Sequence, residues 1–126
     1  MLIGLGQTFM DFSKEVKVEY RATYSAGGNA SFRSFTPVDI GAASPERIVV
    51  VTTAGYRNAS FTNTVTINGI TATQIISGGA FDSSAIYAAK VPTGENVTVV
   101  VNSSTNVDTL RIYTYAIYGL DNLTVL

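Results

Sequence analysis

Alternation of apolar and polar residues with a period of two dominates the chain, and it predicts β-strands. Residues 16–21 alternate Val, Val and Tyr with Lys, Glu and Arg, which predicts a half-buried strand with a charged outer face. Residues 47–53 contain the run Ile-Val-Val-Val, which is typical of a central strand buried on both faces. Further strands are expected at 84–91, 97–101 and 110–120, and residues 123–126 are one more candidate.

The clearest local signal lies at residues 65–72, where Asn68-Gly69 separates two alternating apolar segments. This pair predicts a two-residue type I′ hairpin, because both turn positions need a positive φ. Clusters of glycine, proline, serine and asparagine predict turns at 27–29, 41–45, 77–79, 92–94 and 102–106. No segment shows a helical stripe longer than a turn or two. The chain is therefore expected to be all-β, an antiparallel β-sandwich of the jelly-roll or immunoglobulin-like kind.

The first 15 residues are glycine-bearing, aromatic and apolar, without clear alternation. They are expected to form an extended N-terminal arm or an edge strand, and residues 16–126 a single β-sandwich domain. Phe9 and Phe12 in this arm are candidate anchors that dock into a neighbouring subunit. The alternative is that both rings fold back onto the core of their own chain.

Charged residues make up only 13% of the chain, and its net charge is −1. No basic run exists to neutralise phosphates, so no nucleic-acid partner is expected. No stretch approaches the roughly 20 apolar residues of a membrane-spanning helix, so no membrane association is expected. The start of the chain lacks the cationic residues of a secretory signal. A surface with so few charges repels other copies of the protein only weakly, which suits a protein inside an assembly.

Histidine, cysteine and tryptophan are absent from the chain. Nucleophilic catalysis therefore lacks its usual base, and zinc lacks its preferred ligands. The aspartates do not follow the spacing of a calcium-binding loop. Asp39, Glu46, Asp82 and Glu95 mostly flank turns, where carboxylates are usually solvated rather than paired for hydrolysis. We expect no enzymatic activity, no cofactor and no metal.

The segment 110–118 is rich in tyrosine and isoleucine. Strand geometry places Tyr113, Tyr115 and Ile117 on one face and their neighbours on the other. Because one face must be core, the second presents either a tyrosine-rich surface or another buried layer. Tyrosine is favoured at protein interfaces and also stacks on sugars. Tyr113 and Tyr115 are therefore candidate interface residues, with ordinary sheet surface and a sugar platform as the alternatives.

Five segments between residues 35 and 120, taken in order, carry a resemblance to known proteins. They are Phe35-Thr36-Pro37-Val38-Asp39-Ile40-Gly41, Ser44-Pro45-Glu46-Arg47-Ile48-Val49-Val50-Val51, residues 65–73, residues 85–94 and Ala116-Ile117-Tyr118-Gly119-Leu120. This order resembles a β-sandwich module of structural proteins in tailed-bacteriophage virions. Residues 1–30 lie outside the resemblance.

The resemblance implies a structural virion protein, and a domain of this size looks most like a capsid decoration (cement) protein on the capsid surface. Its implied partners are the major capsid protein and copies of itself, as a homotrimer or another small homo-oligomer. Such a protein stabilises the assembled shell by mass action, because it binds the shell and not its separate parts. The alternatives are a receptor- or glycan-binding domain of a tail fibre or spike, and a secreted adhesin or lectin-like domain outside phages.

Overall fold

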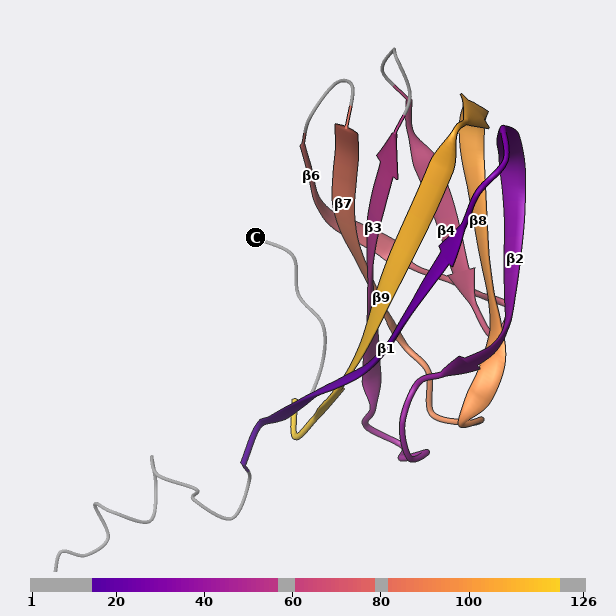
Figure 1. Ribbon diagram of the computed structural model, residues 1–126. Coiled ribbons are helices and arrows are strands. Elements are labelled where there is room, and N and C mark those ends of the chain that lie inside the picture. Colours follow the sequence, from indigo (N-terminus) through magenta and orange to yellow (C-terminus); the bar gives the residue numbers. More distant parts are fainter. Residues whose placement is uncertain (1–14, 57–60, 79–81, 121–126) are drawn as a thin grey trace, which may run out of the picture.

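Two antiparallel β-sheets pack face to face in the computed structural model, which describes residues 15–56, 61–78 and 82–120 (Figure 1). The strands in these residues are β1 (Lys17–Ala26), β2 (Ala30–Asp39), β3 (Ile48–Tyr56), β4 (Asn63–Ile67), β5 (Ile70–Thr71), β6 (Thr73–Gly78), β7 (Asp82–Lys90), β8 (Asn96–Val107) and β9 (Thr109–Tyr118). One sheet has the order β1-β9-β3-β7-β6 and the other β2-β8-β4-β5. The expected β-sandwich is confirmed. The arm residues Phe9 and Phe12 and the candidate strand at 123–126 lie outside the described residues.

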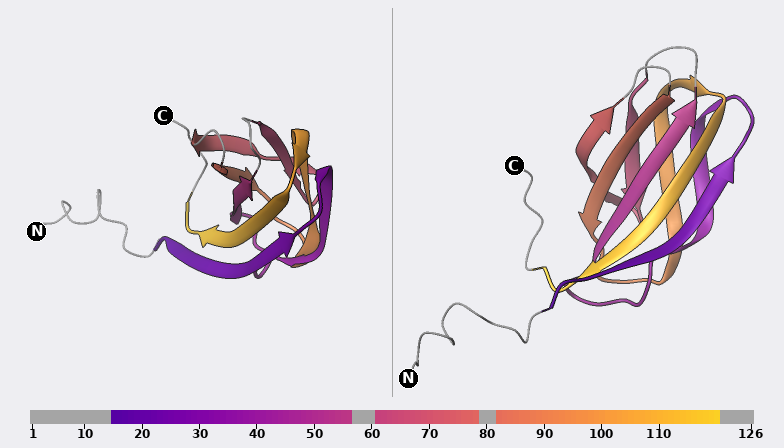
Figure 2. Two further views of the ribbon diagram at one scale, coloured as in Figure 1. Left: turned by 45° about the horizontal axis from the view of Figure 1, so that its top comes forward. Right: turned by 60° about the vertical axis from the view of Figure 1, so that its left-hand side comes forward.

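The strands pair as a nested set. β1 pairs with β9, β2 with β8, β3 with β7 and β4 with β5, all antiparallel. Such nesting arises when one long antiparallel hairpin curls so that successive strand pairs alternate between two sheets, which is the jelly roll. β6 adds one strand to the edge of the larger sheet, beside β7. Of the two sandwiches expected, the topology is the jelly roll, and the two curled layers are visible in Figure 2.

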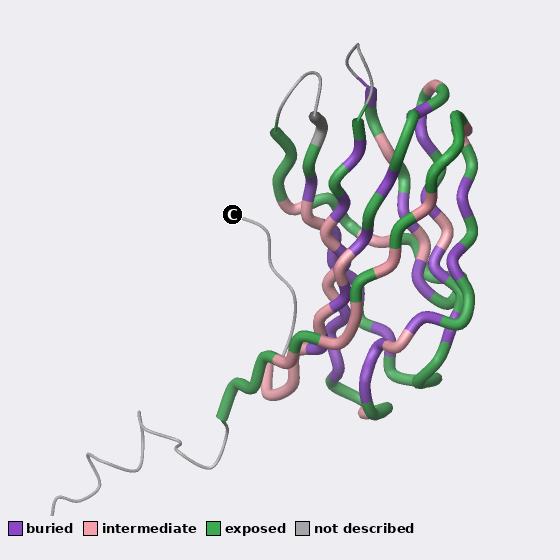
Figure 3. Tube along the Cα trace, viewed as in Figure 1, coloured by how far each residue is buried: buried purple, intermediate pink, exposed green. Residues whose placement is uncertain are grey.

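The core lies between the two sheets and is built from alternate residues of each strand. Figure 3 shows buried positions alternating with exposed ones along the strands. Most of the fully buried side chains are β-branched, and such side chains pack well against their neighbours on a pleated sheet. The largest apolar ones in the core are Tyr87, Ile40, Ile67, Leu110 and Ile112. Tyr87 is the one aromatic ring among them, and burial raises the pKa of its hydroxyl.

A buried arginine closes one end of the sandwich. Arg47 has no exposed surface, and its guanidinium donates to three backbone carbonyls: Gly41 at 2.7 Å, Val91 at 2.8 Å and Thr93 at 2.9 Å. These carbonyls belong to the β2–β3 loop and to the loop that follows β7. Burial lowers the pKa of Arg47, yet a guanidinium stays protonated in proteins. One side chain thus ties two loops together without a carboxylate partner among the described residues.

A second arginine does the same at the opposite end. Arg33 of β2 is 6% exposed and donates to the carbonyls of Ala30 and Val107, each at 2.9 Å, and to that of Gly28. It therefore joins the β1–β2 turn to the end of β8. Between β1 and β2 the chain reverses direction through Gly28, whose φ of 84° lies in the left-handed region that favours glycine.

Two of the expected local structures have definite outcomes. The hairpin is confirmed: Asn68 and Gly69 have φ values of 52° and 81°, and Ile67 lies opposite Ile70. The turn expected at 102–106 is wrong, because β8 continues to Val107. Asn102, Ser104 and Asn106 are exposed strand positions, whereas Ser103 is buried, and the backbone of Asn102 pairs with β2 and β4. A run of Asn, Ser and Thr therefore marks a solvent-facing strand here rather than a loop.

The orientation expected for the first strand is wrong. Val18 and Tyr20 of β1 are 62% and 56% exposed, although alternation with charged residues had placed them inside. A bulge between Tyr20 and Ala22 shifts the register with β9, so that Ala22 and Tyr24 turn inward instead. β1 is an edge strand, and its first residues extend past the body of the sandwich in Figures 1 and 2. Beyond the rim, neither of its faces meets the second sheet.

The burial expected for the central strand is right for one face and wrong for the other. β3 does lie in the middle of the five-stranded sheet, between β9 and β7. On the core side, Val49 and Val51 are fully buried. On the outer side, Ile48 is buried, Val50 and Thr52 are half-buried and Ala54 is exposed. Apolar residues of β3 therefore also lie on the outer surface of the sheet, which no described element covers.

Candidate interaction surface

The outer face of the five-stranded sheet is apolar. Near the start of β1 and the end of β9, the strand register places Val18 opposite Ile117, and Tyr20 opposite Tyr115. We call these four residues the tyrosine patch. The rings of Tyr20 and Tyr115 meet edge to face, with centroids 5.6 Å apart and an interplanar angle of 63°. This geometry is favourable for aromatic pairs, so the two rings form a preorganised surface.

Beside the tyrosine patch a second row of side chains crosses the sheet from β9 to β6. The register aligns Tyr113 with Thr52, Thr52 with Ile86, and Ile86 with Ile76. We call these four residues the ridge. Ile76 on the edge strand is 59% exposed, and the other three are half-buried. Clustered apolar side chains on a sheet surface point to a contact with something other than water.

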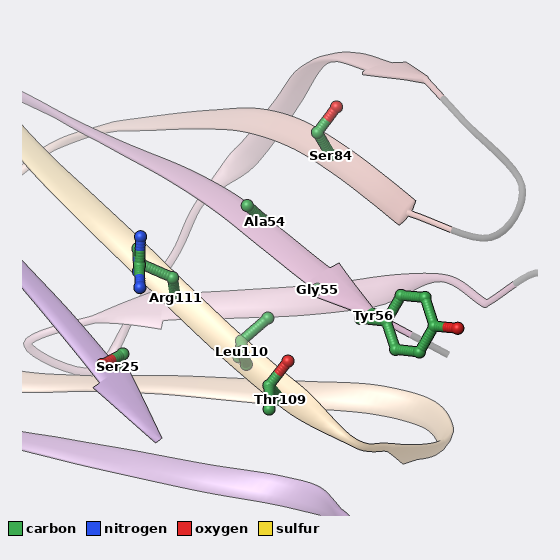
Figure 4. A pocket seen from close by; sticks show the side chains of 8 residues that line it. All are labelled: Ser25, Ala54, Gly55, Tyr56, Ser84, Thr109, Leu110 and Arg111. Atoms are coloured by element: carbon green, nitrogen blue, oxygen red, sulfur yellow. The ribbon is translucent and has the colours of Figure 1, made fainter. Parts of the chain in front are cut away.

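The next row consists mostly of small residues and forms a trough. Its members, in register across all five strands, are Ser25, Arg111, Ala54, Ser84 and Gly78. Two adjacent depressions of about 430 and 410 Å³ lie along this row, and Ala54 and Ser84 line both. Figure 4 shows the first depression, with Tyr56 at its far end and Arg111 on the β9 side. The trough exists because side chains are small in one row and large in the ridge beside it.

Arg111 is the one charged side chain in the trough. It forms no ion pair with any residue in the described parts of the chain. The other basic residue on this face, Lys90, lies three rows away and pairs with Glu46 at 3.5 Å. The trough therefore combines apolar walls with a single positive charge. It suits an apolar ligand that carries one negative group.

The outer face of the four-stranded sheet has the opposite chemistry. Its rows are composed mostly of Thr, Ser and Asn: Ser34, Thr36, Thr64, Thr66, Thr71, Asn96, Thr98 and Asn102. Thr98 and Thr36 form a hydrogen bond of 3.1 Å across two strands. Phe32 is the large apolar exception, 57% exposed. This is the ordinary division of an antiparallel sheet, apolar inside and polar outside.

Ion pairs are placed at the rim where the two sheets meet. Arg21 of β1 forms two contacts of 3.1 Å with the carboxylate of Asp39 in β2. It also contacts Glu19, which in turn pairs with Lys17 at 2.9 Å. The Arg21 guanidinium lowers the pKa of Asp39 below its usual value, with a further contribution from the Gly41 amide. These charges lie at the rim and join the two sheets.

No group of three or more potential metal-ligating side chains occurs within residues 15–56, 61–78 and 82–120. Over the same residues, no helix is long and apolar enough to cross a membrane. Among the buried polar atoms, the hydroxyl of Thr53 and the Nε of Arg33 have no hydrogen-bond partner there.

The structure places the sequence candidates unequally. Tyr113 and Tyr115 lie on the outer face, while the alternate residues of β9, Ile112 and Ala116, are buried, which decides the core side that the sequence had left open. Val18 and Tyr20 were missed as surface residues because the alternation had assigned them to the core. The trough was missed altogether, since its members come from five strands and none is unusual alone. Phe9 and Phe12 stay predictions.

No protein-family model matches the chain, and no curated protein matches it either. Among solved structures, a chain described as part of the cyanophage Pam1 capsid asymmetric unit is similar. The two chains are 17% identical with a TM-score of 0.39, and the match covers 82% of this chain and 84% of that one. At this identity and TM-score, the similarity by itself establishes neither a shared function nor a shared partner.

Proposed function

We propose that the protein is a structural component of a tailed-bacteriophage virion, a decoration protein that binds the assembled head and catalyses no reaction. The observation that carries the proposal is the contrast between the two outer faces. A binding protein that coats a shell needs one adhesive side and one side that tolerates water. The tyrosine patch and ridge supply the first, and the Thr- and Asn-rich sheet supplies the second.

The virion setting is supported by the resemblance of residues 35–120 to phage structural modules. The jelly roll does not decide the matter, because this fold serves capsid proteins, lectins and enzymes alike. The absence of histidine and cysteine supports a role without catalysis. Binding to the finished shell and not to its parts would stabilise the shell by the free energy of binding.

In this proposal the tyrosine patch is the contact with the shell. Val18 and Tyr20 are the two most exposed large apolar side chains of the patch, and the Tyr20 ring is oriented by Tyr115. Tyrosine offers a large contact area with few rotatable bonds and a polar tip, which is why it is frequent among interface hot spots. A hydrogen bond of 2.5 Å between the hydroxyls of Tyr20 and Thr23 holds that tip.

The test uses a pair of aromatic residues with matched exposure on opposite faces. Tyr20 is 56% exposed and Phe32 is 57% exposed. Purified protein is mixed with heads that lack it, the heads are pelleted, and the bound fraction is measured for Tyr20→Ser and Phe32→Ser. We expect Tyr20→Ser to weaken binding at least about thirtyfold and Phe32→Ser to leave it within about twofold. Equal binding by both variants, or no binding by the unmodified protein, contradicts the proposal.

A second candidate is a glycan- or receptor-binding domain of a tail fibre or spike. The exposed ring of Tyr20 beside Tyr115 favours it, because aromatic faces also stack on sugars. Pelleting with host cells separates the two. Binding to cells that a free glycan competes away, together with no binding to heads, would establish this candidate in place of decoration.

A further inference from the structure

The trough on the outer face has a shape and charge that a segment of this chain matches. It is walled by the ridge on one side and by Tyr56 on the other, and it contains one cation, Arg111. Residues 1–14 contain one acidic side chain, Asp11, which lies between Phe9-Met10 and Phe12, and one basic side chain, Lys14, at the end of the segment. An acid flanked by apolar side chains is the complement of a cation flanked by apolar walls.

The same copy cannot supply this segment to its own trough. Glu15 lies against Gly119, just beyond the end of β9, and Arg111 is eight residues back along that strand. At 3.3 Å per residue this separates the two by about 26 Å. From Glu15 to Asp11 is four residues, which span at most about 14 Å even when fully extended. The turn needed to reverse the chain shortens that reach further.

The start of β1 also points the wrong way for such a contact. Its first residues leave the body of the sandwich, as both views of Figure 2 show. A segment of 14 residues extends over as much as about 46 Å, while the trough crosses five strands, about 19 Å. The segment is therefore long enough to leave one molecule and fill the trough of another.

We infer that residues 1–14 of one copy bind in the trough of a second copy, with the Asp11 carboxylate paired to Arg111 and Phe9 and Phe12 seated beside the ridge. This inference goes beyond the proposed function, because it concerns contacts between copies and not with the shell. It gives the trough an occupant and leaves the tyrosine patch free. Because each molecule has one segment and one trough, the exchange gives a reciprocal pair, a closed ring or an open filament.

The test is a charge exchange in the full-length protein without heads. Association is measured by sedimentation velocity for the unmodified chain, Arg111→Glu, Asp11→Arg and the double variant with both changes. Lys90→Glu is the matched control, since it makes the same charge change on the same face outside the trough. We expect each single trough or segment variant to weaken association at least about thirtyfold, and the double variant and the control to associate like the unmodified chain.

A second measurement guards against variants that fail to fold. A synthetic peptide of residues 1–14, labelled with a fluorophore, should bind the full-length chain and dissociate its oligomers, and Arg111→Glu should bind it at least about thirtyfold more weakly. The inference is overturned if the unmodified protein stays monomeric at about 100 μM, if Arg111→Glu associates normally, or if the double variant stays as weak as the single ones. Head binding is absent from both assays, so their failure leaves the decoration proposal to its own test.

Discussion

The two outer faces of this sandwich are built by the same β-strand geometry and yet differ in chemistry. On the four-stranded sheet, outward positions are mostly Thr, Ser and Asn, and Phe32 and Val100 are apolar exceptions. On the five-stranded sheet, the tyrosine patch and the ridge present mostly Tyr, Ile and Val, the trough presents small residues, and Arg111 is the charged exception there. Folding explains the inner faces of both sheets, because both bury the same core. It does not explain the apolar outer face, on which the proposed contact rests.

The largest effect should come from a change that destabilises the whole fold, because both outer faces depend on it. Arg47→Met deprives the carbonyls of Gly41, Val91 and Thr93 of their buried donor. Unsatisfied buried acceptors cost about 1–3 kcal/mol each, so the free energy of unfolding should fall by at least about 3 kcal/mol. Urea denaturation measures it. Lys90→Met, at an exposed position, should change stability by less than about 0.5 kcal/mol. Similar values for both would mean that Arg47 does not hold the loops.

The next largest effect should separate the two faces by their response to one added charge. Tyr115→Lys inserts a cation into the tyrosine patch, and Val100→Lys inserts one on the opposite sheet at a position that is also half-buried. A desolvated, unpaired charge in an interface costs several kcal/mol, so Tyr115→Lys should weaken head binding about a hundredfold or more. Val100→Lys should leave it within about twofold. Calorimetric titration with heads measures both, and a loss with Val100→Lys would reverse the assignment of the faces.

A smaller effect should follow from filling the trough. Ala54 lines both depressions and is exposed, so Ala54→Leu fits the fold and occupies space meant for a ligand. We expect about tenfold weaker self-association with unchanged melting temperature. Thr66→Leu adds similar bulk to the other sheet and serves as the control. If Ala54→Leu associates as strongly as the unmodified chain, the trough is not the contact.

How far the sequence predicts this molecule depends on whether a feature is local. The Asn68-Gly69 turn needs two residues, and it was predicted. β2 was missed, since Arg33 takes an inward position and breaks the apolar alternation that marks a strand. The side on which Tyr20 lies depends on a bulge that only pairing with β9 defines. A turn is determined by adjacent residues, whereas the face on which a side chain lies depends on how its strand pairs with another.

The candidate surface was predictable in part for the same reason. Tyr113 and Tyr115 belong to one strand, so their shared face followed from the period of two, and only the identity of the solvent side had to be decided. The trough needs Ser25, Ala54 and Ser84 side by side, about 30 residues apart in the chain. Small residues at such separations carry no signal until the strand register is known.

The smallest effect concerns the rim that joins the two sheets. Asp39 has a pKa below its usual value because it pairs with Arg21. A carboxyl whose pKa is lower in the folded state adds stability above its unfolded pKa, near 3.9, and loses it as the pH falls through the folded value. Asp39→Asn should therefore lower stability at pH 7, by less than Arg47→Met does, and should make no difference at the acid end. Thermal melts from pH 2 to pH 7 measure it, and a difference that persists in acid would refute the ion pair as the cause.

Covalent footprinting of the two exposed aromatic rings tests the central claim most directly. Tyr20 and Phe32 are equally exposed in the free chain, 56% and 57%, and lie on opposite faces. Hydroxyl radicals should therefore label both in the purified protein. On assembled heads, labelling of Tyr20 should fall severalfold, while Phe32 should stay as reactive as before. Protection of Phe32 with Tyr20 still labelled would show that the polar face makes the contact and that the account is wrong.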